Sequence, residues 1–286
     1  MLSECVAWRK ATAFSCMKAT EPSSDFWRKY WWLPILVLAV GVSIGTIAFR
    51  YEPPDYRKVI DRQTSSVSAL ESAGSTLPPV KALRYVRRSI LVTQRGSTEV
   101  VGKSTVTPLG GGWLLREDDW YDKYGQALLY QERHVMYRGL IAVHSQYREI
   151  APFFHQLFGS LGWRIDETVS QTATGKLPTG GVNEIVTVSQ SNHTNIDWTT
   201  MGTLPLTDYQ KSISCRPVGL VSGSEIHGSV RGQHQLVACV ISPPEQTRGL
   251  VYVSEFGMYF PMELKSKDPA APLAFKTYDS IELLRD

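Results

Sequence analysis

An uncharged run of twenty residues near the amino terminus constrains this chain more than any other feature of its sequence. Residues 30–49 read YWWLPILVLAVGVSIGTIAF and contain no formally charged side chain. At about 1.5 Å per helical residue the run covers about 30 Å, the thickness of a hydrocarbon core. We therefore predict one transmembrane helix over residues 30–49; a buried core helix is the alternative.

The flanks of this run and two glycines inside it support the same prediction. Aromatic residues gather at both predicted membrane interfaces, where amphipathic rings are enriched. These interface anchors are Trp27, Tyr30, Trp31, Trp32 and Tyr51. Gly41 and Gly45 lie four residues apart, a spacing that lets another membrane helix approach closely. We predict helix packing there, with the ordinary abundance of glycine in membrane helices as the alternative.

The formal charge of the chain is uneven along its length. The net charge of +3 arises within the first fifty residues, and the remaining 236 residues are formally neutral. Neutralising the phosphates of a nucleic acid requires an excess of Lys and Arg. The composition therefore disfavours a nucleic-acid partner, and the predicted membrane span makes other membrane-complex subunits the expected partners.

No arrangement of residues in the sequence predicts an active site. The six histidines lack metal-ligand spacing, and the one GxSxG match lies inside the apolar run 41–45 rather than at a strand-to-helix turn. The acidic run Glu117-Asp118-Asp119 is typical of a solvated loop or a helix start, with binding of a cation or a basic partner as the alternative. We therefore predict no catalytic, cofactor-binding or metal-binding residue, and no enzyme.

The pattern of apolar residues predicts an organisation of the chain into parts. Residues 126–147 carry apolar residues near helical spacing, a second short helix is predicted from Pro152, and 184–189, 233–241, 250–256 and 275–284 have the character of strands. Helices followed by an antiparallel sheet define the α+β class. The predicted parts are an N-terminal tail 1–29, the membrane helix 30–49, a stalk 50–80, an extra segment 81–125, and a soluble α+β domain 126–286 with an insertion 163–224.

Four further residues have open interpretations. Cys215 and Cys239 are expected to be two small buried side chains, and a disulfide in an oxidising compartment is the alternative. Trp113 and Trp120 are candidate partner contacts if they are exposed, with core burial as the alternative. The triplet 192–194 is a glycosylation sequon, which matters only in the secretory pathway.

Several segments resemble a family of mitochondrial inner-membrane proteins. The end of the predicted short helix at 157–159 and the strand, turn and strand of 231–241 and 248–253 are similar to the import-translocase subunit Tim-twenty-one and the related cytochrome oxidase assembly factor one. The final strand 275–284 also matches this pattern. The resemblance implies a non-enzymatic inner-membrane protein whose large domain faces the intermembrane space and contacts respiratory-chain or translocase subunits.

The resulting prediction is an accessory or assembly subunit of a mitochondrial respiratory-chain complex. One alternative is a component of the inner-membrane import translocase. Another is a bacterial or secretory-pathway envelope protein, either a complex subunit or a membrane-tethered enzyme.

Overall fold

The computed structural model describes residues 32, 54–71, 77–93, 96–150, 163–180, 184–198, 202–262 and 278–284. Contacts divide the chain into Met1–Ile47 and Ala48–Asp286, and the second unit, the body, contains every described residue except Trp32. Apart from Trp32, the predicted membrane span 30–49 with Gly41 and Gly45 lies outside the described residues, as does the predicted helix from Pro152. The same holds for the interface anchors other than Trp32.

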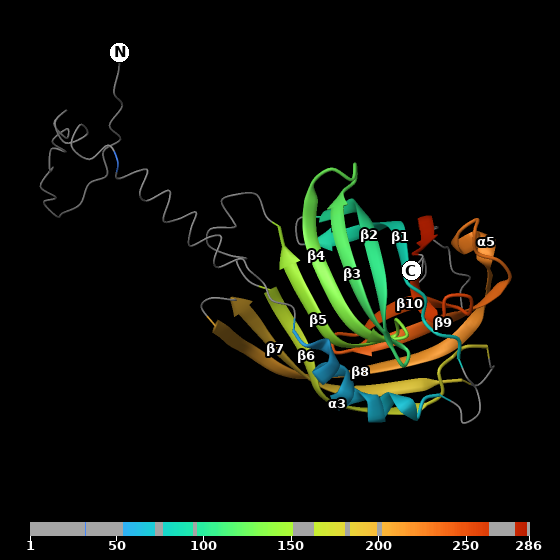
Figure 1. Cartoon of the computed structure of the whole chain (residues 1–286), viewed down its shortest axis with the longest axis horizontal. Helices are drawn as coiled ribbons and strands as arrows, with labels where there is room; N and C mark the ends of the chain where they lie inside the picture. Colours follow the sequence, from blue (N-terminus) through green and yellow to red (C-terminus); the bar gives the residue numbers. More distant parts are fainter. Residues whose placement is uncertain are drawn as a thin grey trace, which may run out of the picture. The chain divides into compact units, whose positions relative to one another are not determined.

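Strands account for most of the described body (Figure 1). The helices within the described residues are α3 (Tyr56–Ser68) and α5 (Gly223–Ile226). The strands are β1 (Leu83–Thr93), β2 (Gly96–Gly110), β3 (Trp113–Asp122), β4 (Leu128–Tyr137), β5 (Ile141–Glu149), β6 (Trp163–Gly175), β7 (Val186–Trp198), β8 (Gly202–Ser222), β9 (Gln233–Ser242), β10 (Gln246–Val253), β11 (Met258–Met262) and β12 (Tyr278–Leu283). No helix among the described residues combines the length and the apolarity needed to cross a bilayer.

All twelve strands belong to one antiparallel sheet with a simple order. Neighbours in sequence are neighbours in the sheet from β1 to β11, and β12 returns to pair with β1. Short turns suffice for such connections, because antiparallel neighbours need no crossover. In Figure 1, β1–β5 form a curved layer over β8–β10, so the sheet is rolled rather than flat.

The prediction of an α+β fold is therefore wrong. Residues 126–147, predicted as a helix, form β4 and most of β5, joined at a tight turn where Arg138 and Gly139 have positive φ. A Cβ at Gly139 would lie 2.5 Å from the Tyr259 carbonyl oxygen, so the turn needs glycine. The segments 81–125 and 163–224 hold β1–β3 and β6–β8, which are integral parts of the sheet.

Other strand predictions are confirmed. Residues 233–241 form β9, and β10 returns beside it as the predicted hairpin. The predicted strands 184–189 and 275–284 lie largely within β7 and β12. An alternating pattern, as in 184–189, and a short continuous apolar run, as in 233–241, both indicate strands.

Helix α3 packs against the sheet although its sequence suggested a stalk. Asp55 caps its first turn by accepting a hydrogen bond from Arg57 N at 3.1 Å. Val59 and Val67 are buried, and Gln63 Nε2 donates to the Thr168 carbonyl of β6 at 2.9 Å. The helix is thus fixed to the body by an apolar stripe and by a buried hydrogen bond to the backbone.

Two hydrophobic clusters hold the rolled sheet together. The first joins α3 to residues of β3–β5 and β7–β11, among them Tyr137 and Val237. In the second, the rings of Tyr85 on β1 and Phe260 on β11 lie 5.5 Å apart, and Tyr278 of β12 donates its hydroxyl to the Pro261 carbonyl at 2.6 Å. Strands from opposite ends of the sheet order therefore pack on one another.

Arg138 ties three segments together at the β4–β5 turn. Its Nε and Nη2 donate to Glu71 Oε1 at 3.0 and 2.9 Å, and its Nη1 donates to the carbonyls of Pro78 and Gly257 at 2.9 and 3.0 Å. The side chain is buried, so these partners replace the water that a guanidinium would otherwise bind.

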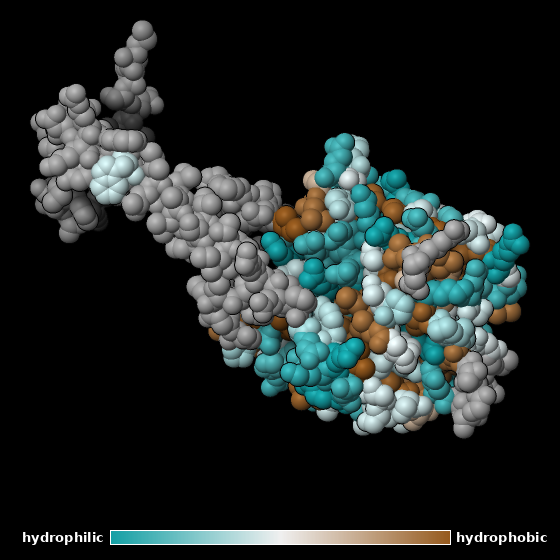
Figure 2. Space-filling view, in the orientation of Figure 1, coloured by the Kyte–Doolittle hydropathy of each residue, from teal (hydrophilic) through white to brown (hydrophobic). Residues whose placement is uncertain are grey.

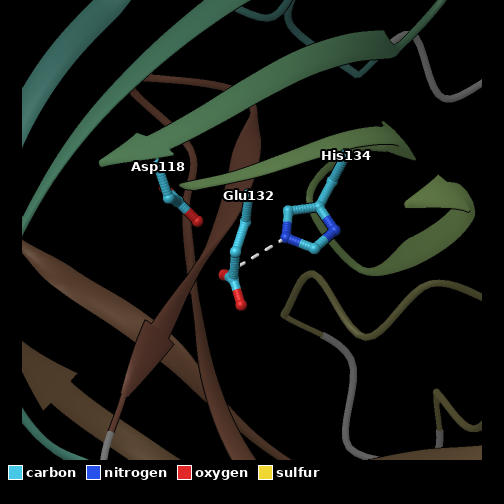
Figure 3. Close-up of side chains that lie close together, drawn as sticks. All are labelled: Asp118, Glu132 and His134. Atoms are coloured by element: carbon cyan, nitrogen blue, oxygen red, sulfur yellow. Dashed lines mark hydrogen bonds and ion pairs between the residues drawn. The ribbon is translucent and has the colours of Figure 1, made fainter. Parts of the chain in front are cut away.

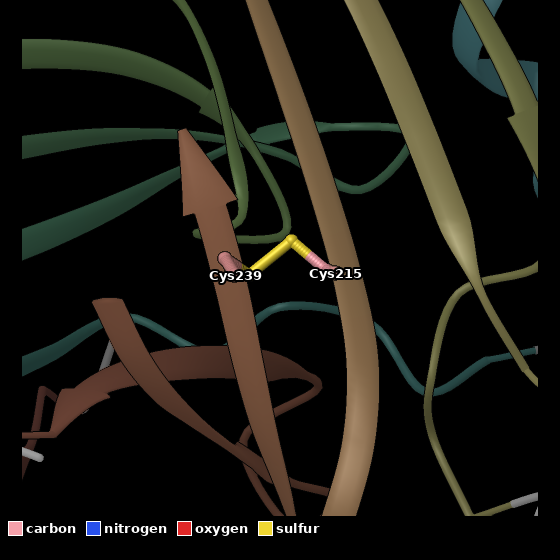
Figure 4. The surroundings of a disulfide bond; sticks show 2 residues. All are labelled: Cys215 and Cys239. Carbon is pink, nitrogen blue, oxygen red and sulfur yellow. A yellow bond between two sulfur atoms is a disulfide. The ribbon is translucent and has the colours of Figure 1, made fainter. Parts of the chain in front are cut away.

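Cys215 of β8 and Cys239 of β9 form a disulfide (Figure 4). The expectation of two unlinked buried side chains was therefore wrong. The two residues are direct partners in the β8–β9 register, which brings sulfur atoms 24 residues apart in sequence into contact. Sequence spacing alone does not reveal such a pairing.

Candidate functional site

The pairing of β3 with β4 places charged residues side by side inside the body. Arg116 pairs with His134, and Asp118 pairs with Glu132, so all four side chains share one face of the sheet. Arg87 of β1 reaches the same place and completes what we call the charge cluster: Arg87, Arg116, Asp118, Glu132 and His134.

The carboxylate of Asp118 lies at the centre of this cluster. Its side chain is 0% exposed, and its Oδ2 lies 2.9 Å from Arg116 Nε and 4.0 Å from Arg87 Nη2. Within the described residues, neither carboxylate oxygen of Asp118 accepts a hydrogen bond of good geometry. The Asp118–Arg116 pair is therefore held by the attraction of opposite charges. Two guanidinium groups and two carboxylates leave the cluster formally neutral.

Aromatic residues cover the cluster on one side. The Arg87 guanidinium lies 4.6 Å from the centre of the Trp120 ring, and the indole N–H of Trp120 donates to Glu132 Oε2 at 3.3 Å. Gly102 faces the same ring: a Cβ there would lie 2.9 Å from Trp120 Cζ3. A larger residue at 102 would therefore displace the tryptophan from its position beside the arginine.

Burial and neighbouring charges fix the protonation states. Burial alone would raise the pKa of Asp118, but the charges of Arg116 and Arg87 outweigh it and hold that pKa below its usual value. Burial lowers the pKa of His134, and Arg116 lowers it further. At neutral pH the cluster therefore contains an ionised Asp118 and a neutral imidazole.

His134 also links a serine to a carboxylate. Its Nδ1 lies 3.0 Å from Ser145 Oγ, and its Nε2 lies 3.4 Å from Glu132 Oε2. A hydroxyl, an imidazole and a carboxylate in series are the parts of a hydrolytic triad. Here Ser145 and His134 are both buried, although Glu132 borders a surface hollow that Lys103 and Glu117 also line. A nucleophile needs access to its substrate, which this arrangement does not offer.

Three side chains of the cluster could also be considered as metal ligands. One atom each from Asp118, Glu132 and His134 lies within 4.8 Å of the others (Figure 3). The spacing suits a cation, but Arg116 and Arg87 already balance the two carboxylates. A divalent ion would add two uncompensated positive charges to a buried region. The three ligand atoms therefore have a spacing that suits a metal ion, but the charge of the cluster disfavours one.

The structure separates residues that the sequence analysis treated together. In the acidic run, Asp118 is fully buried, whereas Glu117 and Asp119 point to the opposite face of β3. The interpretation of this run as a solvated loop or helix start is wrong. Trp113 and Trp120 are buried as well, so the core interpretation holds and neither is available as a surface contact. Trp32, the one predicted membrane-interface anchor among the described residues, is 45% exposed.

Sequence reasoning missed Arg116, Glu132 and His134. No alternation marked them, because residues 116–119 (REDD) and 131–134 (QERH) are continuous polar runs. Only the antiparallel pairing of β3 with β4 shows which residues of these runs share the buried face. The sequon was also misleading: Asn192 is 5% exposed and accepts a hydrogen bond from Thr168 Oγ1 at 2.8 Å, so a glycan there is incompatible with the fold.

Comparisons with known proteins add no relative to this picture. No protein-family model matches the chain, no curated protein matches it, and no solved structure matches its fold.

Proposed function

We propose that the chain is a non-enzymatic binding subunit of a membrane-associated protein complex, with its all-β body in an oxidising compartment. The observation that carries the proposal is the charge cluster, whose ionised groups neutralise one another inside the core. Active sites keep charged or nucleophilic groups open to substrate, whereas Asp118 and His134 of this cluster are buried and the charges of the cluster balance one another. Function is therefore assigned to the surface of the body.

The disulfide supports the choice of compartment. Cys215 and Cys239 are both buried and joined, and disulfides persist in oxidising environments such as the intermembrane space or the secretory lumen. The predicted span 30–49 supplies the proposed attachment to a membrane. An accessory or assembly subunit of a mitochondrial respiratory-chain complex, with the body in the intermembrane space, is the specific form of this proposal.

Native electrophoresis of gently solubilised membranes tests the binding role. We expect the chain to migrate with a large complex, and mass spectrometry of that band names the complex. Migration with respiratory subunits supports the specific form, and cross-linking to arriving precursors supports the import alternative. Migration as a free chain in membranes from every compartment would contradict the proposal.

A serine-directed fluorophosphonate probe tests the absence of catalysis. We expect the native full-length chain to remain unlabelled, because Ser145 is buried against His134. The Ser145→Ala variant is the control for site-specific labelling. Labelling of the wild type that disappears in this variant would show that the serine is accessible and activated, and the chain would then be a hydrolase.

A further inference from the structure

The tips of the β3–β4 and β7–β8 hairpins lie at the same end of the sheet as the start of β6. Trp163, the first residue of β6, pairs with Asp197 next to the β7–β8 tip. Every second turn of an antiparallel meander falls at the same end, so the β3–β4 tip, residues 122–127, is there too. We call this the tip end of the body.

Helix α3 also begins toward the tip end. Its Arg62 pairs with Glu167 of β6. Just beyond both elements, the backbone N–H of Leu177 donates to the Leu70 carbonyl at 3.4 Å. Residues of the helix therefore meet residues of β6 in sequence order, so the two elements run in the same direction and Tyr56 is the end of α3 nearest the tips.

The chain between the predicted span and α3 is too short to let the body move far from a membrane. Residues 50–55 separate the span 30–49 from Tyr56. Even a fully extended chain of this length reaches only about 25 Å. Whatever membrane holds residues 30–49 therefore lies close to the end of the body where α3 begins.

The β3–β4 hairpin extends past the start of α3 toward the tip end. The strand registers align Glu167 with Val135 of β4. From Val135 to Tyr124 the hairpin extends about 30 Å, whereas α3 begins about 9 Å from Arg62 in that direction. The tip thus lies about 20 Å beyond the start of α3, within reach of the surface of the bilayer.

The β3–β4 tip is an ordered turn that presents an aromatic ring to solvent. Asp122 Oδ1 accepts hydrogen bonds from Gln126 N at 2.7 Å and from Ala127 N at 3.2 Å. Tyr124 is 72% exposed, and the Lys123 ammonium lies 4.9 Å from the centre of its ring. Figure 2 shows this tip as a projection at the top of the body, in the orientation of Figure 1.

The β7–β8 tip presents apolar side chains at the same end. Leu204 and Leu206, close to the first residue of β8, are 54% and 47% exposed. Tyrosine is enriched at the level of lipid head groups, and apolar side chains gain by burial at the boundary with the acyl chains. The two tips therefore combine residue types that suit a bilayer surface.

We infer that the tip end of the body rests on the lipid head-group layer, with Tyr124, Leu204 and Leu206 at the boundary between head groups and acyl chains. Lys123 contacts lipid phosphates there, because a lysine stem covers apolar surface while its ammonium stays in the polar layer. The tether keeps the tips at a high local concentration against the bilayer, so a small contact suffices. This inference rests on the membrane attachment in the proposed function.

The test places the full-length chain in phosphatidylcholine vesicles that include a phosphatidylcholine analogue with a photoreactive group near its glycerol backbone. Irradiation followed by mass spectrometry locates the lipid adducts on the chain. We expect adducts on residues 123–125 and 204–206. Leu220, which is 65% exposed at the opposite end of β8, is the internal control and should carry several-fold fewer adducts.

Charged variants sharpen the test. Tyr124→Asp/Leu204→Asp/Leu206→Asp should reduce the adducts at both tips several-fold, because a carboxylate is costly to remove from water. Leu220→Asp is the matched control and should leave the pattern unchanged. An anchored wild type without adducts at the tips, or with as many at Leu220, would overturn this inference alone. Release of the wild type from the vesicles by alkaline carbonate would overturn the membrane attachment and this inference together.

Discussion

The inner face of the sheet differs between its two halves. In β1–β4 it holds the charge cluster, where Arg116 and Asp118 lie 2.9 Å apart in the core. In β7–β9 it holds apolar side chains such as Val188 and Ile213, together with the Cys215–Cys239 disulfide. In both halves the side chains alternate between the inner and the outer face. The inner face is nevertheless stabilised by buried ion pairs in one half and by apolar packing and a disulfide in the other. Changes of charge and pH in the first half should therefore lower the free energy of unfolding, and so should removal of the disulfide in the second half.

The largest expected effect comes from removing the central carboxylate of the charge cluster. Asp118→Ala leaves Arg116 and Arg87 without their buried partner, and breaking a buried ion pair costs about 3–5 kcal/mol of unfolding free energy. Urea unfolding of the purified chain measures the change. Asp118→Asn is the matched variant, because it keeps the volume and removes only the charge. A cost below about 1 kcal/mol for both variants would show that the pair does not support the fold.

Removing the disulfide should have the next largest effect. The double variant Cys215→Ala/Cys239→Ala releases a closed loop with a sequence separation of 24 residues. The loop-entropy model gives a loss of about 3 kcal/mol for a loop of this size.

Alkylation of the native chain without reduction provides the control for the cysteine variant. The chain has four cysteines, and only Cys5 and Cys16 should be modified if the other two are joined. Modification of all four in protein from its own compartment would contradict the bond and, with it, the oxidising environment.

Acid should weaken the seam between β4 and β5, next to the charge cluster. Burial lowers the pKa of His144 to about 4, and the residue is 3% exposed. Its unfolded pKa is about 6.5, so the unfolded chain binds the proton first and stability is lost as pH falls below about 6.5. Lowering the pH from 7.5 to 5 should cost about 2 kcal/mol through this group. The lowered pKa of His134 acts in the same direction.

Urea unfolding at the two pH values checks this prediction. His144→Gln should reduce the difference between them by about 2 kcal/mol. His227→Gln, which alters a histidine outside this seam, is the matched control. An equal pH dependence in the wild type and the His144 variant would exclude the histidine as its source.

The smallest effect is expected for an exposed ion pair in the charged half. Arg88 Nε lies 3.1 Å from Asp279 Oδ2, but both side chains are well exposed to water. Such pairs contribute about 0–1 kcal/mol, so Arg88→Ala should barely move the urea midpoint. A cost near that of Asp118→Ala would mean that burial is not what distinguishes the charge cluster.

The sequence predicted some elements of the fold well and others poorly, for identifiable reasons. The β9–β10 hairpin was predictable because continuous apolar runs rich in β-branched residues lie on both sides of a proline-containing turn. The β4–β5 hairpin was not, since Leu129, Met136, Leu140 and Val143 also fit helical spacing. The turn at Arg138–Gly139 is stabilised by contacts with Tyr259 and Glu71, both of which are distant from it in sequence. Local patterns do not contain that information.

The charge cluster, like the β4–β5 turn, could not be predicted from local sequence patterns. Glu117, Asp118 and Asp119 look alike in the sequence, yet only Asp118 is fully buried. Its partners Arg87 and Glu132 lie 31 residues before it and 14 after it, and only the strand registers bring them together. The five residues of the charge cluster lie on three strands, and the strand registers place them all on one face of the sheet.

The sequence by itself determined the uncharged run 30–49, the formal neutrality of residues 51–286 and the apolar patterns that mark several strands. These are properties of residues near one another in the chain. The tertiary structure alone decided which alternate face is buried, that Cys215 meets Cys239, and that a charge cluster is buried beside the apolar residues of the first half of the sheet. Alternation defines two faces of a strand, but burial depends on which strands pair and how the sheet rolls, and those contacts join residues far apart in sequence.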